Sequence, residues 1–237
     1  GVDSVRLSKS FTDLSTQYGY LLALKQVKLA DLPIHLHGSL PCTPWTRWQS
    51  FDAFKLGADF HRQLELDRAT SIKMLGYFLQ LARHVQKTGG TISFEWPRFC
   101  AGWDLPLIKI IISEFKLHEC DVDGCSVGVK SVVTGKPILK PWKFYCSQPE
   151  LAQKLGQHRC NKLHSHSICQ GRDTVLTGFY PTDLAKIMID GIFPEKLNNA
   201  NAAIVNYDAV HTKIVQSELD YIKTGGRLPV TVDLYNC

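Results

Sequence analysis

The amino-acid sequence predicts an α/β domain with a mostly parallel sheet and helices on both faces. Short apolar segments alternate with stretches whose apolar residues recur at helical spacing, which is the pattern of such a domain. The chain has 237 residues, 44% of them hydrophobic, so it is long enough to bury a large core. We place this domain at residues 1–194 and a helical or extended tail at 195–237, where asparagine and small residues become frequent.

The first half of the domain alternates predicted strands with predicted helices. The second strand runs directly into the turn Pro41-Cys42-Thr43-Pro44, and the pair Gly89-Gly90 ends the long helix that follows. In chain order, the predicted segments are strand 2–7, helix 16–27, strand 33–40, helix 67–87 and strand 91–95.

The second half alternates helices with one pair of strands. The turn Thr134-Gly135-Lys136-Pro137 separates the two strands of this pair, so we expect them to be neighbours. In chain order, the predicted segments are helix 107–115, strands 118–129 and 140–146, helices 149–155 and 181–192, and a helical segment at 207–222 within the tail.

Composition narrows the class of protein. The longest apolar run is interrupted by Lys109, and the first residues lack the apolar stretch of a secretory signal, so we expect an intracellular chain, nuclear or cytoplasmic, without a membrane span. Eight scattered cysteines favour reduced thiols over a disulfide framework. A net charge of +5 is a modest indication of a nucleic-acid partner.

Cys42 and Glu95 are the first candidates for a reactive site. Each follows a predicted strand, and the carboxyl ends of neighbouring parallel strands meet at the edge of the sheet where ligands bind. A cysteine and a carboxylate at that edge could act as nucleophile and proton donor. Taken singly, Cys42 could also be a small buried cysteine, and Glu95 could be an edge glutamate that faces solvent.

Two histidines precede Cys42 on the predicted strand. His35 and His37 are two residues apart, so their side chains share one face of the strand. One of them could lower the pKa of the Cys42 thiol. The alternative is that both are hydrogen-bonded residues of the core.

Residues 158–169 contain a group of metal-ligand side chains. Cys160, His164, His166 and Cys169 fall within a short segment, and zinc is commonly bound by cysteine and histidine at such separations. The sequence therefore predicts a structural zinc site in this segment. Two alternatives remain open: a polar loop with incidental histidines, or a site completed by one of the cysteines at 120, 125 and 146.

The motifs occur in an order that resembles a known enzyme family. The strings GSLPCTPWTRWQ, GGTISFEWPRFCAGW, DVDGCSVG and GKPILKPWKF resemble the motif order of the cytosine-C5 DNA methyltransferases, with a Pro-Cys loop, a Glu-x-Pro loop and a later basic motif. They are also similar to a methyltransferase-like segment of retrotransposon-type polyproteins, over roughly residues 1–194. This resemblance implies a Rossmann-like, methyltransferase-type fold and a nucleic-acid substrate.

The resemblance also implies roles for individual residues. Cys42 would be the thiolate that adds to C6 of a cytosine flipped out of the stack, and Glu95 would contact its N3 and exocyclic amine. Asp13 and Pro41 fall where the family contacts the cofactor S-adenosylmethionine, although for Asp13 we favour the alternative that it is the N-cap of the first helix.

Substrate contacts follow from the same resemblance. Trp45 and Trp96 flank the two loops and could stack on a base, or could be ordinary core aromatics. Lys140 and Lys143 lie near the basic motif and could contact phosphates, or could belong to a solvated face.

The sequence departs from the family in two places. Glu95 is followed by Trp96 where the family has asparagine, and no glycine-rich cofactor turn precedes Cys42. The motif order starts at what would be the second strand, so either this sequence lacks that part, or another segment or chain supplies it, or the fold no longer binds the cofactor. The leading hypothesis is a methyltransferase-like protein of retroelement origin. The alternatives are a catalytically silent nucleic-acid-binding or assembly module with a structural zinc site, and an unrelated cysteine-dependent enzyme.

Overall fold

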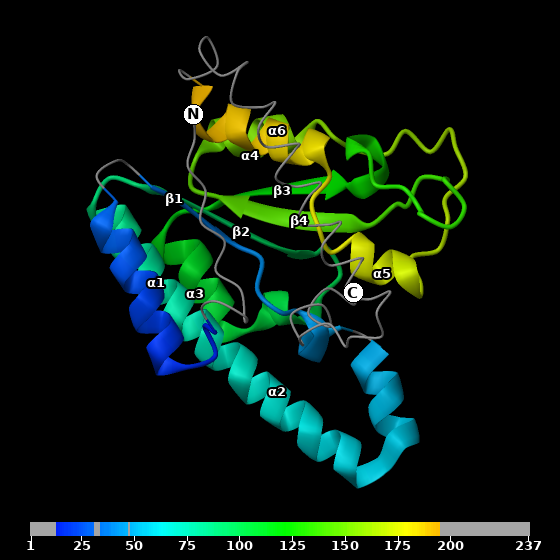
Figure 1. Cartoon of the computed structure of the whole chain (residues 1–237), viewed down its shortest axis with the longest axis horizontal. Helices are drawn as coiled ribbons and strands as arrows, with labels where there is room; N and C mark the ends of the chain where they lie inside the picture. Colours follow the sequence, from blue (N-terminus) through cyan, green and yellow to red (C-terminus); the bar gives the residue numbers. More distant parts are fainter. Residues whose placement is uncertain (1–12, 31–33, 47, 195–237) are drawn as a thin grey trace, which may run out of the picture.

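The protein is an α/β domain in which helices cover both faces of one sheet (Figure 1). The computed structural model describes residues 13–30, 34–46 and 48–194. The predicted strand 2–7 and the predicted tail helix 207–222 lie outside the described residues. The predicted α/β class is confirmed.

The sheet is mixed, so the prediction of a mostly parallel sheet is wrong. Its four strands have the order β1-β2-β4-β3, in which β1 and β2 are parallel and β4 is antiparallel to both of its neighbours. Residues 124–140, which connect β3 to β4, contain one single-turn helix and no α-helical crossover of the kind that usually joins parallel strands. The strands are β1 (His35–Gly38), β2 (Thr91–Pro97), β3 (His118–Asp123) and β4 (Pro141–Cys146).

Three helices cover one face of the sheet, which is the lower face in Figure 1. They are α1 (Gln17–Leu29), α2 (Trp48–Lys87) and α3 (Pro106–Glu114). Phe94 and Trp96 of β2 pack on this side against Phe78 of α2 and Ile111 of α3. This apolar layer holds the two parallel strands in place.

Two of these helices differ from the sequence-based expectation. Helix α2 begins well before the predicted residue 67, and its two helical parts meet at Gly57, whose φ of +77° is accessible to glycine at low cost. Thr16 is the N-cap of α1, because its side chain accepts a hydrogen bond from the Gly19 amide. Asp13 is therefore not the cap.

The opposite face carries a second core. Leu151 and Leu155 of α4 (Pro149–Gly156) and Leu184 of α6 (Thr182–Ile192) pack against Phe144 of β4. A short helix, α5 (Arg172–Leu176), was not predicted, because five residues are too few to show a helical period. Three single-turn helices complete the description: η1 (Thr43–Trp45), η2 (Ala101–Asp104) and η3 (Gly124–Val127).

Within the part of the chain that the structure describes, no helix combines the length and apolar character needed to cross a membrane.

Candidate functional site

A pocket lies where the carboxyl ends of β1 and β2 meet. Cys42 and Glu95 both line it, together with residues from β4 and from the segment between α5 and α6. The pocket has a volume of about 30 Å³, which is room for one or two water molecules. Besides Cys42 and Glu95, the polar and ionisable residues of its lining are Ser39, Lys140, Thr177 and Tyr180.

Glu95 is the buried carboxyl group of this pocket, with only 4% of its surface exposed. Its Oε2 accepts hydrogen bonds from Ser39 Oγ at 2.9 Å and from the Tyr180 hydroxyl at 2.5 Å. Burial raises the pKa of Glu95, and the bonds from Tyr180 and Ser39 and the charge of Lys140 oppose that rise. Glu95 therefore keeps its proton to a higher pH than an exposed glutamate, and it does not face solvent as an edge residue would.

Lys140 points into the same pocket instead of lying on a solvated hairpin. Its ammonium group donates to the carbonyl oxygen of Thr177 and, at 3.1 Å, to the Thr177 hydroxyl. Its backbone φ is +30°, an uncommon value outside glycine. Desolvation lowers the pKa of Lys140, and the nearby Cys169 and Glu95 raise it. Lys143 is directed elsewhere and pairs with Glu119 at 2.5 Å.

Cys42 lies between β1 and η1, with 6% of its surface exposed. Its sulfur is disulfide-bonded in this structure. The expectation of reduced thiols therefore does not hold for Cys42, whereas the cysteines at 100, 120, 125, 146, 160 and 169 are free. A nucleophilic role for Cys42 requires that its disulfide be reduced first.

The two tryptophans that flank the loops are used in packing. Trp96 has 1% of its surface exposed, and its indole N–H donates to the Leu40 carbonyl at 2.6 Å. Trp45 is half-buried, and its N–H donates to Ser71 Oγ at 2.9 Å. Trp96 also lines the pocket, so it forms part of a wall. Both rings stabilise the loops that carry Cys42 and Glu95.

The residues assigned to cofactor binding do not form a site for S-adenosylmethionine. Asp13 Oδ1 accepts hydrogen bonds from the amide and the hydroxyl of Ser15, at 2.9 and 2.6 Å, so it serves the turn before α1. The carbonyl of Pro41 accepts a long hydrogen bond of 3.5 Å from Ser71. Neither Asp13 nor Pro41 is among the residues that line the pocket with Glu95. The described residues thus do not fit this cofactor.

A continuous chain of hydrogen bonds leads from Glu95 along the two parallel strands, and we call it the polar chain. His35 and His37 of β1 alternate in it with side chains of β2, so both are satisfied residues of the core. Desolvation lowers the pKa of His35 to about 3 and that of His37 to about 4, so both are neutral near pH 7. The contacts are Thr91 Oγ1 to His35 Nδ1 (2.8 Å), His35 Nε2 to Ser93 Oγ (2.7 Å), Ser93 Oγ to His37 Nδ1 (2.7 Å), and His37 Nε2 to the Tyr180 hydroxyl (2.9 Å).

Sequence reasoning did not find the polar chain beyond the two histidines. The alternation of His35 and His37 was visible, and Thr91, Ser93 and Glu95 show the same two-residue period in the next strand. The parallel register that places His37 beside Ser93 was the missing information.

A second polar site lies in the segment after α4. Cys125, Cys160, His164 and His166 place their ligand atoms within 4.8 Å of one another. Cys160 Sγ is 3.8 Å from His164 Nε2 and 3.5 Å from His166 Nε2. Two sulfurs and two imidazole nitrogens at this spacing could hold a metal ion.

Three of the four residues predicted as metal ligands belong to this cluster. Cys160, His164 and His166 belong to the cluster, and Cys125 of η3 takes the place that we predicted for Cys169. Cys169 instead lies 3.4 Å from the Thr177 hydroxyl, on the side of the pocket. The sequence left Cys125 open as an alternative, and only the tertiary fold brings η3 next to the loop.

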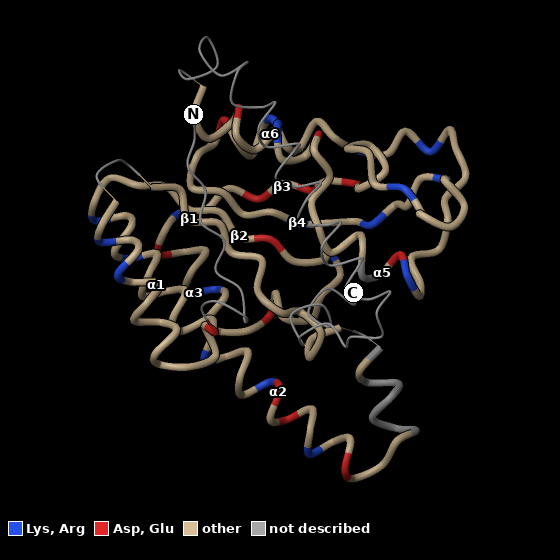
Figure 2. The backbone as a smooth tube through the Cα atoms, in the orientation of Figure 1, with Lys and Arg blue, Asp and Glu red and all other residues tan. Residues whose placement is uncertain are grey.

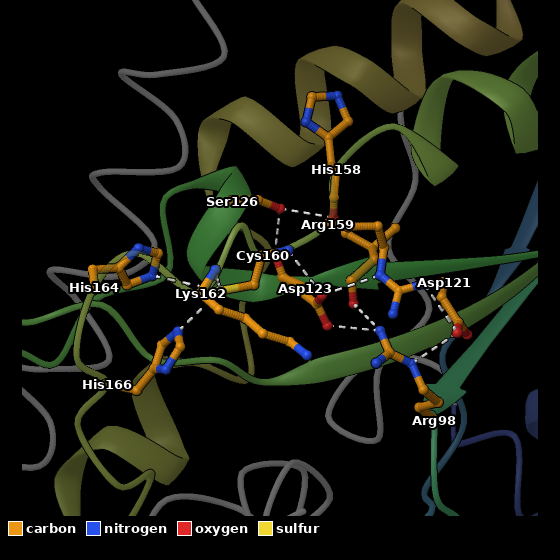
Figure 3. A network of polar contacts seen from close by, with 11 residues as sticks. Arg98, Asp121, Asp123, Ser126, His158, Arg159, Cys160, Lys162, His164 and His166 are labelled. Carbon is orange, nitrogen blue, oxygen red and sulfur yellow. Dashed lines mark hydrogen bonds and ion pairs between the residues drawn. The ribbon is translucent and has the colours of Figure 1, made fainter.

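A network of charged residues holds the loop that carries Cys160 (Figure 3). Asp123 at the end of β3 accepts the Cys160 amide at 2.9 Å and forms ion pairs with Arg98 at 2.7 Å and Arg159 at 3.1 Å. The Lys162 amide donates to Cys160 Sγ at 3.3 Å. These bonds orient Cys160 before any metal binds, as outer-shell partners of metal ligands commonly do.

Comparisons of the chain with protein-family models, with curated protein sequences and with solved structures find no match. Figure 2 shows that Lys and Arg are interspersed with Asp and Glu along α2, whereas the loops 124–140 and 157–171 contain Lys and Arg without Asp or Glu.

Proposed function

We propose that the chain is a cytosine-C5-methyltransferase-like domain whose pocket receives the edge of a pyrimidine base from nucleic acid. One observation carries the proposal: Cys42, which follows β1, and Glu95 of β2 line the same pocket. The motif order described above supports the same assignment. The fold that the resemblance implies, a Rossmann-like sheet of the methyltransferase type, is part of this proposal.

Glu95 supplies the chemistry that the base requires. A protonated carboxyl can donate to the base N3 and accept from the exocyclic amine, so it matches one edge of cytosine. In the reduced chain, the Cys42 thiolate adds to C6 and forms a C–S bond. The displaced electron pair reaches N3, which takes the proton of Glu95, and C5 becomes nucleophilic.

The base must be turned out of its stack, and the pocket must widen to receive it. The present volume of about 30 Å³ holds only water, so the pocket must widen to accept a pyrimidine ring. Turning the base out costs a few kcal/mol, which hydrogen bonds and packing in the pocket would offset. Because the described residues do not fit S-adenosylmethionine, we derive no methyl-transfer step.

Covalent trapping tests this proposal. A DNA oligonucleotide that contains pyrimidin-2-one accepts a thiol at C6 without a methyl donor. We expect the reduced protein to form a denaturation-resistant adduct, which Cys42→Ser abolishes and Glu95→Gln diminishes. Cys100→Ser, which removes a free buried thiol beside the same loops, should leave the adduct unchanged. An equal adduct in Cys42→Ser would refute the assignment.

The metal cluster favours a second candidate, a nucleic-acid-binding or assembly module organised by a structural zinc ion. Tetrahedral Zn²⁺ with bonds of about 2.0 to 2.3 Å separates its ligand atoms by about 3.5 Å. The separations from Cys160 Sγ to the two imidazoles are 3.5 and 3.8 Å, close to that value. Four protein ligands fill the coordination sphere, which is the arrangement of structural rather than catalytic zinc.

Metal analysis of the purified chain tests this candidate. We expect one zinc ion per chain, and we expect Cys125→Ser and Cys160→Ser to lower the content. Cys169→Ser is the matched control, because it lies in the same segment but outside the cluster. Retention of full zinc content by Cys125→Ser, or its loss in Cys169→Ser, would contradict this ligand set.

A further inference from the structure

We propose that the polar chain is a proton path that connects Glu95 in the pocket with the opposite end of strands β1 and β2. The inference deepens the proposed function, because it assigns a route to the proton that Glu95 gives to the base. It rests on a geometric fact that does not depend on that function: each group of the polar chain is both a donor and an acceptor.

The path follows from the register of the two parallel strands. His35 is paired with Thr91 and His37 with Ser93, so side chains of β1 and β2 alternate along one face of the sheet. The distances between successive polar atoms range from 2.7 to 2.9 Å, and the last bond, from Tyr180 to Glu95, is 2.5 Å. These are ordinary or short hydrogen bonds, so the polar chain has no gap.

All hydrogen bonds of the polar chain must point in one direction when Glu95 is ionised. The Tyr180 hydroxyl donates to the carboxylate, so its oxygen accepts from Nε2–H of His37. A neutral His37 then accepts at Nδ1 from the Ser93 hydroxyl. By the same rule, Ser93 accepts from Nε2–H of His35, and His35 accepts from the hydroxyl of Thr91.

This polarity allows Glu95 to be reprotonated without the movement of a heavy atom. The hydroxyl proton of Tyr180 passes to Glu95, and His37 replaces it with its Nε2 proton. Ser93, His35 and Thr91 each pass one proton in turn, and water returns one to Thr91. One proton enters, one reaches the carboxylate, and both histidines end as the other neutral tautomer, so charge and atoms balance.

If the residues of the polar chain served only to pack β1 against β2, their hydrogen bonds would not need to form an unbroken series. Ser93 is completely buried between the two imidazoles, where an apolar residue would pack as well if the histidines were absent. The polar chain also ends on a buried carboxyl that, in the proposed reaction, loses its proton in every cycle. Tyr180 and His37 are therefore positioning residues that act on substrate only through Glu95.

The tautomers of the two histidines test the geometry on the protein without substrate. With ¹⁵N-labelled histidine, we expect His35 and His37 to be neutral and protonated on Nε2 at a pH where the infrared carbonyl band of protonated Glu95 is absent. Assignment comes from the loss of one signal in His35→Gln and in His37→Gln. An Nδ1-protonated or charged form of either residue at that pH would overturn the inference. This outcome is separate from the trapping experiment, which requires no particular tautomer.

Proton exchange at Glu95 tests the transport. The infrared carbonyl band of protonated Glu95, identified by its absence in Glu95→Gln, shifts when the protein is mixed rapidly with D₂O. We expect the shift to be on the order of 10²-fold slower in Ser93→Ala, which interrupts the polar chain. Ser71→Ala removes another buried serine hydroxyl, one that does not belong to the polar chain. In this variant the Glu95 proton should exchange at the wild-type rate. Equal rates in wild type and Ser93→Ala would show that protons enter through the pocket, and would refute the path.

Discussion

The two faces of strand β2 are both buried but differ in chemistry. On the face toward α2 and α3, Ile92, Phe94 and Trp96 join an apolar cluster. On the other face, Ser93 and Glu95 are buried polar residues. Each residue from 92 to 96 is at most 4% exposed, so the degree of burial does not distinguish the two faces.

This difference shows where the strand serves folding and where it serves a site. Burying apolar surface stabilises the fold in proportion to area, whereas a buried hydroxyl or carboxyl needs a partner to avoid a cost. Among the described residues, Ser93 and Glu95 obtain their side-chain hydrogen bonds from the polar chain and from Ser39. We therefore expect substitutions on the apolar face to change stability, and those on the polar face to change protonation as well.

The largest expected effect is that of Phe94→Ala. Phe94 is 1% exposed and has ring contacts with Phe78 at 5.4 Å and with Trp96 at 5.1 Å between centroids. Removing the ring leaves a cavity, so we expect a loss of about 3–5 kcal/mol in the free energy of unfolding. Urea denaturation measures it. A loss below that caused by Ser93→Ala would contradict the assignment of the main core to this face.

Ser93→Ala should cost less, about 1–3 kcal/mol, because it leaves one nitrogen on each of His35 and His37 without a partner. The same denaturation experiment measures this loss. Ser71→Ala, which removes the hydrogen bond from the Trp45 indole and a long one to the Pro41 carbonyl, is the control and should cost about 1 kcal/mol. Equal losses of stability in Ser93→Ala and Ser71→Ala would mean that His35 and His37 do not need the Ser93 hydroxyl as a hydrogen-bond partner.

Acid titration separates the faces through the histidines. The pKa of His37 falls from 6.5 to about 4 on folding, so the unfolded chain binds more protons between these values. Stability should therefore decline as pH falls from about 6.5 toward 4, by at most about 1.4 kcal/mol per pH unit for each such histidine. Thermal unfolding of metal-free protein measures the slope, which His37→Gln should reduce. An unchanged slope in that variant would contradict the buried, neutral state of His37.

The order of elements was predictable from sequence, but their directions were not. Apolar periodicity located β2, α3 and β4 almost to the residue, because each has one or two buried faces. The same signal does not report strand direction. The link from β3 to β4, residues 124–140, lacks the α-helical crossover that usually joins parallel strands, and the antiparallel β4 makes the sheet mixed.

The sites were predictable where their residues are close in sequence. Cys160, His164 and His166 are separated by few residues, so composition alone identified them. Cys125 and Tyr180 reach their sites from other segments, and no local pattern marks them. For Lys140, the sequence leaves open a phosphate contact or a place on a solvated face. The structure turns it inward through a left-handed backbone and the oxygens of Thr177, which a sequence pattern does not show.

The smallest expected effect is that of Glu95→Gln, which keeps the volume of the side chain and an oxygen that can accept from Tyr180 and Ser39. The folded state raises the pKa of Glu95, mainly through desolvation, so the folded chain binds more protons than the unfolded chain above pH of about 4.3. Wild-type stability from this group is present at low pH and is lost as pH rises through the folded pKa. The glutamine variant does not titrate, so its stability relative to wild type should increase with pH, opposite to the trend from His37. Thermal unfolding of both proteins from pH 4 to 8 measures the difference. A difference that stays constant over this range would mean that Glu95 is ionised in the pocket throughout, and the polar face of β2 would then hold a charge rather than a proton.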